Sequence, residues 1–153
     1  MESANRTGLV ELIAQARAEK DYDRLAEFVP YAKLLGIRFR EDEAGQLLFW
    51  LDYKPENIGN ALMPALHGGV IAAFMEHAAT LQILWQRETV TLPKIIDFSI
   101  DYLRPGRPET LYARCSLVRQ GQRIANVAVS AWQGDPERMV ATARMHFLLS
   151  RPS

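Results

Sequence analysis

The chain has 153 residues, of which 48% are hydrophobic and 24% are charged, and its 18 basic residues balance its 18 acidic residues. This composition is typical of a soluble globular protein large enough for one hydrophobic core, so we expect a single domain. A chain without a basic stripe is not expected to bind nucleic acid, and one without a long apolar run is not expected to span a membrane, so we expect a cytoplasmic location.

Helical spacing dominates the first 35 residues. Apolar residues predict one helix over residues 7–20, capped by Thr7, and a second short helix that is capped by Asp21 and ended by Pro30. One more helical turn follows and is closed by Gly36. We therefore expect an amphipathic helical lead-in ahead of the main part of the domain.

The spacing changes from helical to strand-like after this point. Residues 37–40 and 47–53 flank a turn at residues 43–45, like the two arms of a hairpin. A loop rich in turn formers, residues 54–60, then leads through Pro64 into the next helix.

That helix, residues 67–85, carries apolar residues all round its axis, which is typical of a buried helix. Glu76 lies in its middle. A carboxylate is rarely buried without a partner or a task, so Glu76 is a candidate catalytic residue. The alternative is a structural ion pair between Glu76 and an arginine of the sheet.

Four further strands are predicted after the helix, because apolar and polar residues alternate and turn formers separate the segments. With the first two strands they favour an α+β fold, in which a curved antiparallel sheet of about six strands wraps around one long central helix. Residues 1–35 are then the helical lead-in, and residues 36–150 are the main part of a single domain. The four strands are expected at residues 96–102, 111–117, 125–131 and 139–149.

Two glycines, Gly68 and Gly69, open the central helix and let a ligand approach its N-terminus, where free N–H groups and the helix dipole suit an oxyanion. Glu76 follows Gly68 by eight residues, a rise of about 12 Å. That separation is too long for the two groups of one chain to hold a single carbonyl group. We therefore expect a site shared between two chains, with the two helices antiparallel across a dimer axis.

Small and polar residues surround Glu76 on the helix. Ala72 and Ala73, one turn before it, leave open space, and Thr80, one turn after it, could donate a hydrogen bond to the carboxylate or to a water. His67 is a further candidate site residue, interpreted as the residue that orders the loop at the helix start rather than as a proton shuttle, with an imidazole that could still line the site. No metal is expected, because the residues that could bind one lack the spacing of metal ligands: His77, His146 and Cys115.

With these residues the sequence resembles the hot-dog-fold acyl-CoA thioesterases of the phenylacetate-degradation (PaaI) type. The matching features are the segment Leu66–Gly69, the acid at Glu76 and the strand Ile96–Pro105, which contains the pattern Asp-x-x-x-Asp-Tyr-Leu-Arg-Pro. The resemblance covers residues 36–149. A Glu followed four residues later by a Thr, here Thr80, is also similar to one branch of the 4-hydroxybenzoyl-CoA thioesterases.

The resemblance implies hydrolysis of an acyl-CoA thioester to a free acid and coenzyme A, at the interface of a homodimer that usually forms part of a homotetramer. It implies that the Gly68 N–H polarises the thioester carbonyl and that Glu76 acts as general base or nucleophile. In the family, a polar residue shortly before His67 often fixes the substrate or a water, and Asn60 and Asn57 are the two candidates here. No cofactor is expected.

Other residues are expected to bind the substrate. Gly69 lies at the start of the helix where a ligand can approach, and Ala72 and Ala73 lie beside the carboxylate. Ile95 stands where some relatives have a serine that holds the attacking water, so this chain lacks that serine. Four arginines near strand ends or turns could bind the phosphates of coenzyme A: Arg104, Arg107, Arg119 and Arg123.

Two other functions are considered beside hydrolysis. An enoyl-thioester hydratase or dehydratase of this fold would carry a catalytic histidine well ahead of the helix acid, where this chain has Leu62. A non-catalytic acyl-CoA sensor joined to a DNA-binding helix-turn-helix is disfavoured, because the lead-in is not basic and lacks the glycine turn. The acyl group stays open, although four residues could form an apolar lid over it: Phe28, Tyr31, Leu34 and Leu35.

Overall fold

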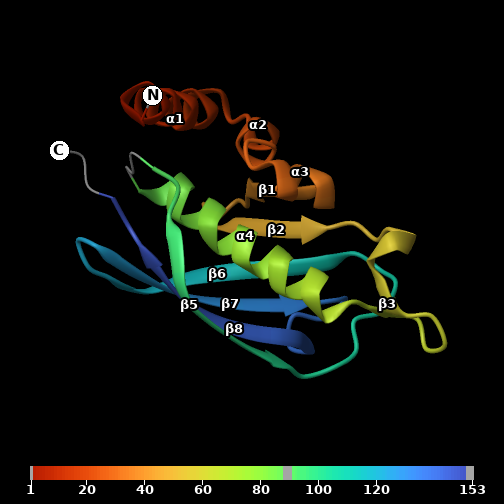
Figure 1. Cartoon of the computed structure of the whole chain (residues 1–153). Helices are drawn as coiled ribbons and strands as arrows, with labels where there is room; N and C mark the ends of the chain where they lie inside the picture. Colours follow the sequence, from red (N-terminus) through yellow and green to blue (C-terminus); the bar gives the residue numbers. More distant parts are fainter. Residues whose placement is uncertain (1, 88–90, 151–153) are drawn as a thin grey trace.

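The computed structural model describes residues 2–87 and 91–150, in which the long helix α4 (Gly68–Gln86) lies across a six-stranded antiparallel sheet (Figure 1). The strand order in the sheet is β1-β2-β6-β7-β8-β5. This architecture confirms the predicted α+β hot-dog fold. The strands are β1 (Ile37–Glu41), β2 (Leu47–Leu51), β5 (Lys94–Tyr102), β6 (Leu111–Gln120), β7 (Ile124–Trp132) and β8 (Met139–Leu148).

Three short elements between β2 and α4 were not predicted. The 3-10 turn η1 (Pro55–Asn57) leads into β3 (Ile58–Asn60), which pairs with β4 (Ala65–Leu66) in a separate two-stranded sheet. Strands of two or three residues are too short to show a period of two, so sequence spacing cannot reveal them. This small sheet brings the chain to the start of α4.

The core lies between α4 and the sheet. One face of β7 is buried at every second residue from Ala125 to Ala131, as the period of two requires. Phe74 and Met75 of α4 are fully buried in the same core. Burying such a side chain contributes about 1.5–3 kcal/mol, so this contact is a principal source of stability.

The sequence predicts that α4 is covered on every side, and this prediction is wrong for the single chain. Five of its residues form a half-exposed stripe, called the open stripe below, which the described part of the chain covers only in part. The open stripe consists of Ala72, Ala73, Glu76, His77 and Thr80.

The lead-in forms three helices, α1 (Glu2–Glu19), α2 (Tyr22–Ala26) and α3 (Pro30–Leu35). Thr7 lies inside α1, so its prediction as a cap was wrong, since the amphipathic spacing begins later than the helix itself. Pro30 begins α3 instead of ending α2, as suits a residue without an N–H.

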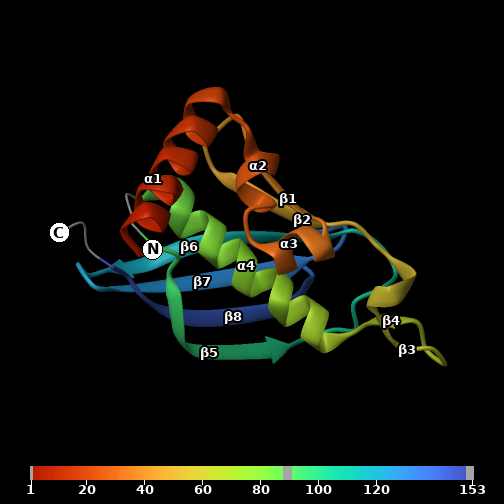
Figure 2. The same cartoon turned by 45° about the horizontal axis from the view of Figure 1, so that its top comes forward.

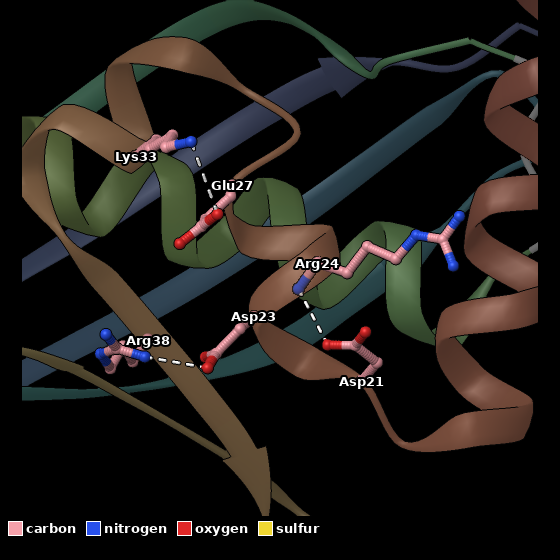
Figure 3. A network of polar contacts seen from close by, with 6 residues as sticks. All are labelled: Asp21, Asp23, Arg24, Glu27, Lys33 and Arg38. Carbon is pink, nitrogen blue, oxygen red and sulfur yellow. Dashed lines mark hydrogen bonds and ion pairs between the residues drawn. The ribbon is translucent and has the colours of Figure 1, made fainter.

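Two other caps were predicted correctly. The Asp21 carboxylate accepts a hydrogen bond from the Arg24 N–H at 3.1 Å at the start of α2 (Figure 3). Gly36 ends α3 with a φ of 75°, a conformation that favours glycine.

The lead-in packs beside α4 and β1, as Figure 2 shows. Arg17 of α1 donates hydrogen bonds to the carbonyl oxygens of Leu84 at 2.7 Å and Arg87 at 2.9 Å, at the C-terminus of α4. A cation there is favoured by the helix dipole as well as by the two carbonyls. Exposed ion pairs such as Arg38–Asp23, at 2.9 Å (Figure 3), add little stability.

None of the helices in the described ranges has both the length and the apolar character that a membrane span requires.

Arg17→Met is expected to lower the free energy of unfolding by about 2 kcal/mol, because the hydrogen bonds to both carbonyls are lost. For a chain of this size the melting temperature should fall by roughly 4–8 °C in a thermal unfolding scan. Arg24→Met, at an exposed arginine whose backbone alone bonds to Asp21, is the matched control and should change the melting temperature little. Equal shifts for the two variants would contradict the capping role of Arg17.

Candidate active site

The start of α4 is held in place by its own cap. The His67 Nδ1 atom accepts a hydrogen bond from the Gly69 N–H at 2.9 Å. The His67 carbonyl oxygen accepts from the N–H groups of Val70 at 3.0 Å and Ile71 at 3.2 Å. Among the described residues, nothing accepts a hydrogen bond from the Gly68 N–H. This donor is therefore free at the positive end of the helix dipole.

The loop before α4 packs closely on His67. The His67 N–H donates to the Asn57 carbonyl oxygen at 2.7 Å. A Cβ atom at Gly59 would lie only 2.8 Å from the Cα of His67, so only glycine allows this approach. The two contacts fix the position of the helix start.

Tyr102, at the end of β5, also holds this region and was not among the predicted site residues. Its hydroxyl donates a hydrogen bond to the Gly68 carbonyl oxygen at 2.6 Å. The sequence carried one signal of this role, because Tyr102 belongs to the Asp-Tyr-Leu-Arg-Pro pattern of the resemblance. Spacing alone could not connect the residue to Gly68.

Glu76 lies half-buried in the open stripe, beside Ala72 and Ala73. Burial raises the pKa of its carboxyl group. Within residues 2–87 and 91–150 the carboxylate has no hydrogen bond or ion pair, so the structure does not support a structural pairing with an arginine. A half-buried carboxylate without a partner is suited to accept a proton or to attack a carbonyl group.

Thr80 and His77 lie next to Glu76 on the helix, and the Thr80 hydroxyl bonds differently from the prediction. Thr80 donates its hydroxyl proton to the Glu76 backbone carbonyl oxygen at 3.1 Å, and not to the carboxylate. A threonine within a helix commonly donates its hydroxyl proton to the carbonyl oxygen four residues earlier, and this carbonyl competes with any other acceptor for the proton. The His77 ring contacts the Tyr31 ring, and burial lowers the pKa of His77, so this imidazole is neutral at pH 7.

The two candidate asparagines before the helix differ in environment. The Asn60 side-chain oxygen accepts hydrogen bonds from the N–H groups of Leu62 at 3.0 Å and Met63 at 3.3 Å, and so orders the turn between β3 and β4. Asn57 is buried, and its side-chain nitrogen has no partner in the part of the chain that is described. Asn57 thus has a donor that a water or a ligand could use.

The four arginines fall into two groups that the structure does not bring together. Arg104 donates to the Met139 carbonyl oxygen at 3.0 Å. Arg107 pairs with Glu109 at 3.3 Å. Both follow β5, whose last residue contacts the start of α4. The other two are Arg119, near the end of β6, and Arg123, in the turn between β6 and β7. They line a cavity of about 600 Å³ together with Asn126 and His146.

Neither a metal site nor a reactive thiol is found among the described residues. No group of three or more His, Cys, Asp or Glu side chains in the described ranges could hold a metal ion. The His146 Nδ1 atom lies 3.3 Å from the Asp97 carboxylate, and two such side chains do not make a metal site. Burial raises the pKa of the lone cysteine, Cys115, and so keeps its sulfur protonated.

Known proteins resemble this chain in sequence and in structure. The family described as the thioesterase superfamily matches residues 63–140. The medium/long-chain acyl-CoA thioesterase YigI of Escherichia coli is 32% identical over 136 aligned residues, which cover 79% of this chain and 86% of the relative.

Two solved structures extend the comparison. A Chromobacterium violaceum protein is 48% identical with a TM-score of 0.74, and the match covers 92% of this chain and 98% of that one. A phenylacetic acid degradation-related protein of Ralstonia eutropha has the same fold, with 21% identity, a TM-score of 0.73 and coverage of 90% and 98%.

Glu76→Gln is expected to raise the melting temperature above that of the wild type at about pH 8. Because burial raises the pKa of Glu76, the folded chain binds this proton more tightly than the unfolded chain does. Stability therefore falls as the pH rises from the ordinary glutamate pKa through the raised value, and the glutamine avoids this loss. The advantage should shrink as the pH is lowered to about 4.

Thermal unfolding of the two chains across this pH range measures the effect. Glu137→Gln, at an exposed glutamate, controls for the loss of one negative charge. A Glu76→Gln chain that is less stable than the wild type at about pH 8 would show that the carboxylate has a stabilising partner.

Proposed function

The chain belongs to the thioesterase superfamily, and we propose that it hydrolyses acyl-CoA at a site that two copies of α4 build together. The chain is a thioester hydrolase, and the name of its relative YigI supports acyl-CoA as the substrate class. One observation carries the proposal. An unpartnered carboxylate of raised pKa, Glu76, lies on the same helix as a free N-terminal N–H, at Gly68.

In the proposed reaction, the Gly68 N–H donates a hydrogen bond to the thioester carbonyl oxygen and stabilises the negative charge that develops on it. As a base, Glu76 takes a proton from a water whose oxygen attacks the carbonyl carbon. The carbon–sulfur bond then breaks, the coenzyme A sulfur takes up a proton, and the free acid forms. As a nucleophile, Glu76 would attack the same carbon, the carbon–sulfur bond would break, and coenzyme A would leave as the thiol after its sulfur takes up a proton. Water would then open the resulting anhydride to the free acid and the Glu76 carboxylate. The raised pKa favours the base, because such a base is strongest where its pKa approaches the working pH.

Neighbouring residues have supporting roles in this proposal. His67 orders the start of α4 through the Gly69 N–H. Thr80 keeps two hydroxyl lone pairs and could accept a bond from the attacking water while it donates to the helix. Asn57 is favoured over Asn60 as the residue that fixes a water or the substrate, since its buried side-chain nitrogen has no described partner.

The proposed active unit is a homodimer. Gly68 and Glu76 of one helix are about 12 Å apart, so a single carbonyl group can reach both only if they come from two chains. Two features support such an assembly: β5 is an edge strand with its outer side unpaired in the single chain, and Phe98 and Ile100 on it are only partly buried. A homotetramer of two dimers is proposed from the resemblance alone.

In this proposal the substrate has three parts to place: the acyl carbonyl, the phosphates of coenzyme A and the acyl tail. We place the acyl carbonyl beside Gly69, Ala72 and Ala73. For the phosphates of coenzyme A we favour Arg123, which lines a pocket, over Arg104 and Arg107, whose side chains already bond within the chain.

Residues 1–35 are proposed to cover the acyl tail, and residues 36–150 to carry the catalytic groups. The apolar side chains of Phe28, Tyr31 and Leu34 are exposed, and the Tyr31 ring reaches the open stripe at His77. Leu35 was wrongly predicted as part of this lid, because it is buried in the core. The name of YigI favours a medium or long tail. The cytoplasmic location stays a prediction.

Glu76→Gln is expected to reduce the turnover of acyl-CoA by at least about 10³-fold, because the amide can neither accept a proton nor attack a carbonyl. Release of coenzyme A from short, medium, long and aryl acyl-CoAs, read with a thiol reagent, measures it. Glu137→Gln should keep wild-type turnover. Activity within a few fold of the wild type would remove Glu76 from the mechanism, and a wild-type chain that binds acyl-CoA without releasing a thiol would favour the non-catalytic alternative.

A mixture of two inactive chains should regain activity if the site is shared. One chain carries Glu76→Gln and the other Gly68→Pro, which lacks the N–H. Proline is tolerated as the first helical residue, and His67 before it has a ψ of 130°, which suits a residue before proline. A heterodimer has one site with both defects and one site with none.

Refolded mixtures should therefore regain up to about half of the wild-type activity per heterodimer. Gly68→Ala, which keeps the N–H, controls for the added bulk in the second chain. Mixtures that form heterodimers but stay inactive would contradict a site shared between chains.

A further inference from the structure

Two successive peptide groups at the start of α4 are held in different ways. The peptide between His67 and Gly68 accepts two hydrogen bonds at its oxygen, and its N–H is free. The peptide between Gly68 and Gly69 is bonded at both ends, since its oxygen accepts from Tyr102 at 2.6 Å and its N–H donates to His67 at 2.9 Å. The free donor thus adjoins a clamped peptide.

The clamp answers a weakness of the local sequence. Two consecutive glycines have the greatest backbone freedom, and the first turn of a helix is the part that frays most easily. His67 holds the clamped peptide from within the same turn. Tyr102 is the tie from outside, because it lies 34 residues away on β5, and β5 is part of the sheet.

The Tyr102 ring also packs closely against Gly68. A Cβ atom at position 68 would lie 3.2 Å from the Cζ and hydroxyl oxygen of Tyr102 and 3.4 Å from its Cε1. The phenol ring therefore occupies the space that a side chain would need. A Cβ atom at position 68 would thus require the ring to shift by a few tenths of an ångström.

We propose that Tyr102 is a positioning residue that aims the Gly68 N–H at the thioester oxygen. It fixes the neighbouring peptide plane, and through it the direction of the free donor, without touching the substrate. A donor aimed in advance stabilises the charge of the transition state most, because it need not reorient when the charge develops. This inference rests on the proposed function of Gly68.

Tyr102→Phe keeps the ring against Gly68 and removes only the hydroxyl. We expect kcat to fall about threefold to tenfold, the equivalent of one ordinary hydrogen bond. KM for acyl-CoA should change less than twofold, since the loss is felt mainly in the transition state. Tyr53→Phe, at a second exposed tyrosine outside the site, is the matched control and should leave both constants unchanged.

A double variant separates positioning from other roles. If Tyr102 acts only through the Gly68 N–H, adding Tyr102→Phe to Gly68→Pro should not lower the residual kcat further, because no N–H is left to aim. A further fall in that background would show that Tyr102 acts on the substrate directly or on the fold at large, and would overturn the proposal. So would a Tyr102→Phe chain with wild-type kcat, or one whose only change is a higher KM.

The same measurements distinguish the positioning role of Tyr102 from the proposed role of Gly68 as the oxyanion donor. Gly68→Pro tested alone should lose about 10² to 10³ in kcat, the typical value of one oxyanion donor. If it keeps wild-type kcat, the role of Gly68 fails and that of Tyr102 fails with it. If Gly68→Pro is impaired and Tyr102→Phe is not, only the positioning role is wrong.

Discussion

One distance governs this site: the rise of about 12 Å that separates Gly68 from Glu76 along α4. The free N–H, and the carboxylate that has no partner among the described residues, are the two groups of the helix that the proposed mechanism uses, yet one chain cannot bring them to the same atom. If two chains share the site, the open stripe of α4 and the uncovered edge of β5 are the surfaces expected at the interface between them. In the proposed homodimer, these two surfaces are the ones that a second copy would cover.

The site also explains where the fold gives up stability. A half-buried carboxylate without a partner is unfavourable when charged, and a free N–H at a helix start is one hydrogen bond fewer. Both features are the reactive groups of the proposed mechanism. The surrounding structure compensates, since Arg17 caps the far end of α4 and Tyr102 and His67 clamp its near end. Such local losses are expected at catalytic sites.

Much of this could be predicted from the sequence. The period of two in residues 94–148 and the apolar run of α4 predict the sheet and its helix, because these patterns are repeated over many residues. The resemblance to hot-dog thioesterases is confirmed by the family match and by structural neighbours of the same fold. Glu76 stood out because a charge interrupts an apolar run.

The remainder depends on contacts that spacing does not encode. The strands β3 and β4 are too short to show a period. The predicted acceptor of the Thr80 hydroxyl was the Glu76 carboxylate or a water, and only the structure shows that it bonds to the backbone carbonyl oxygen of Glu76. The bond from Tyr102 to Gly68 joins residues that are 34 positions apart in the chain, one from each of the two sequence patterns of the resemblance.

A crystal structure with a non-hydrolysable acyl-CoA analogue, in which a methylene group replaces the thioester sulfur, tests the shared site most directly. The account predicts a carbonyl oxygen about 2.7–3.1 Å from the Gly68 nitrogen of one chain, with its carbon facing the Glu76 carboxylate of the other. An analogue whose carbonyl lies against groups of a single chain, or away from the start of α4, would contradict it.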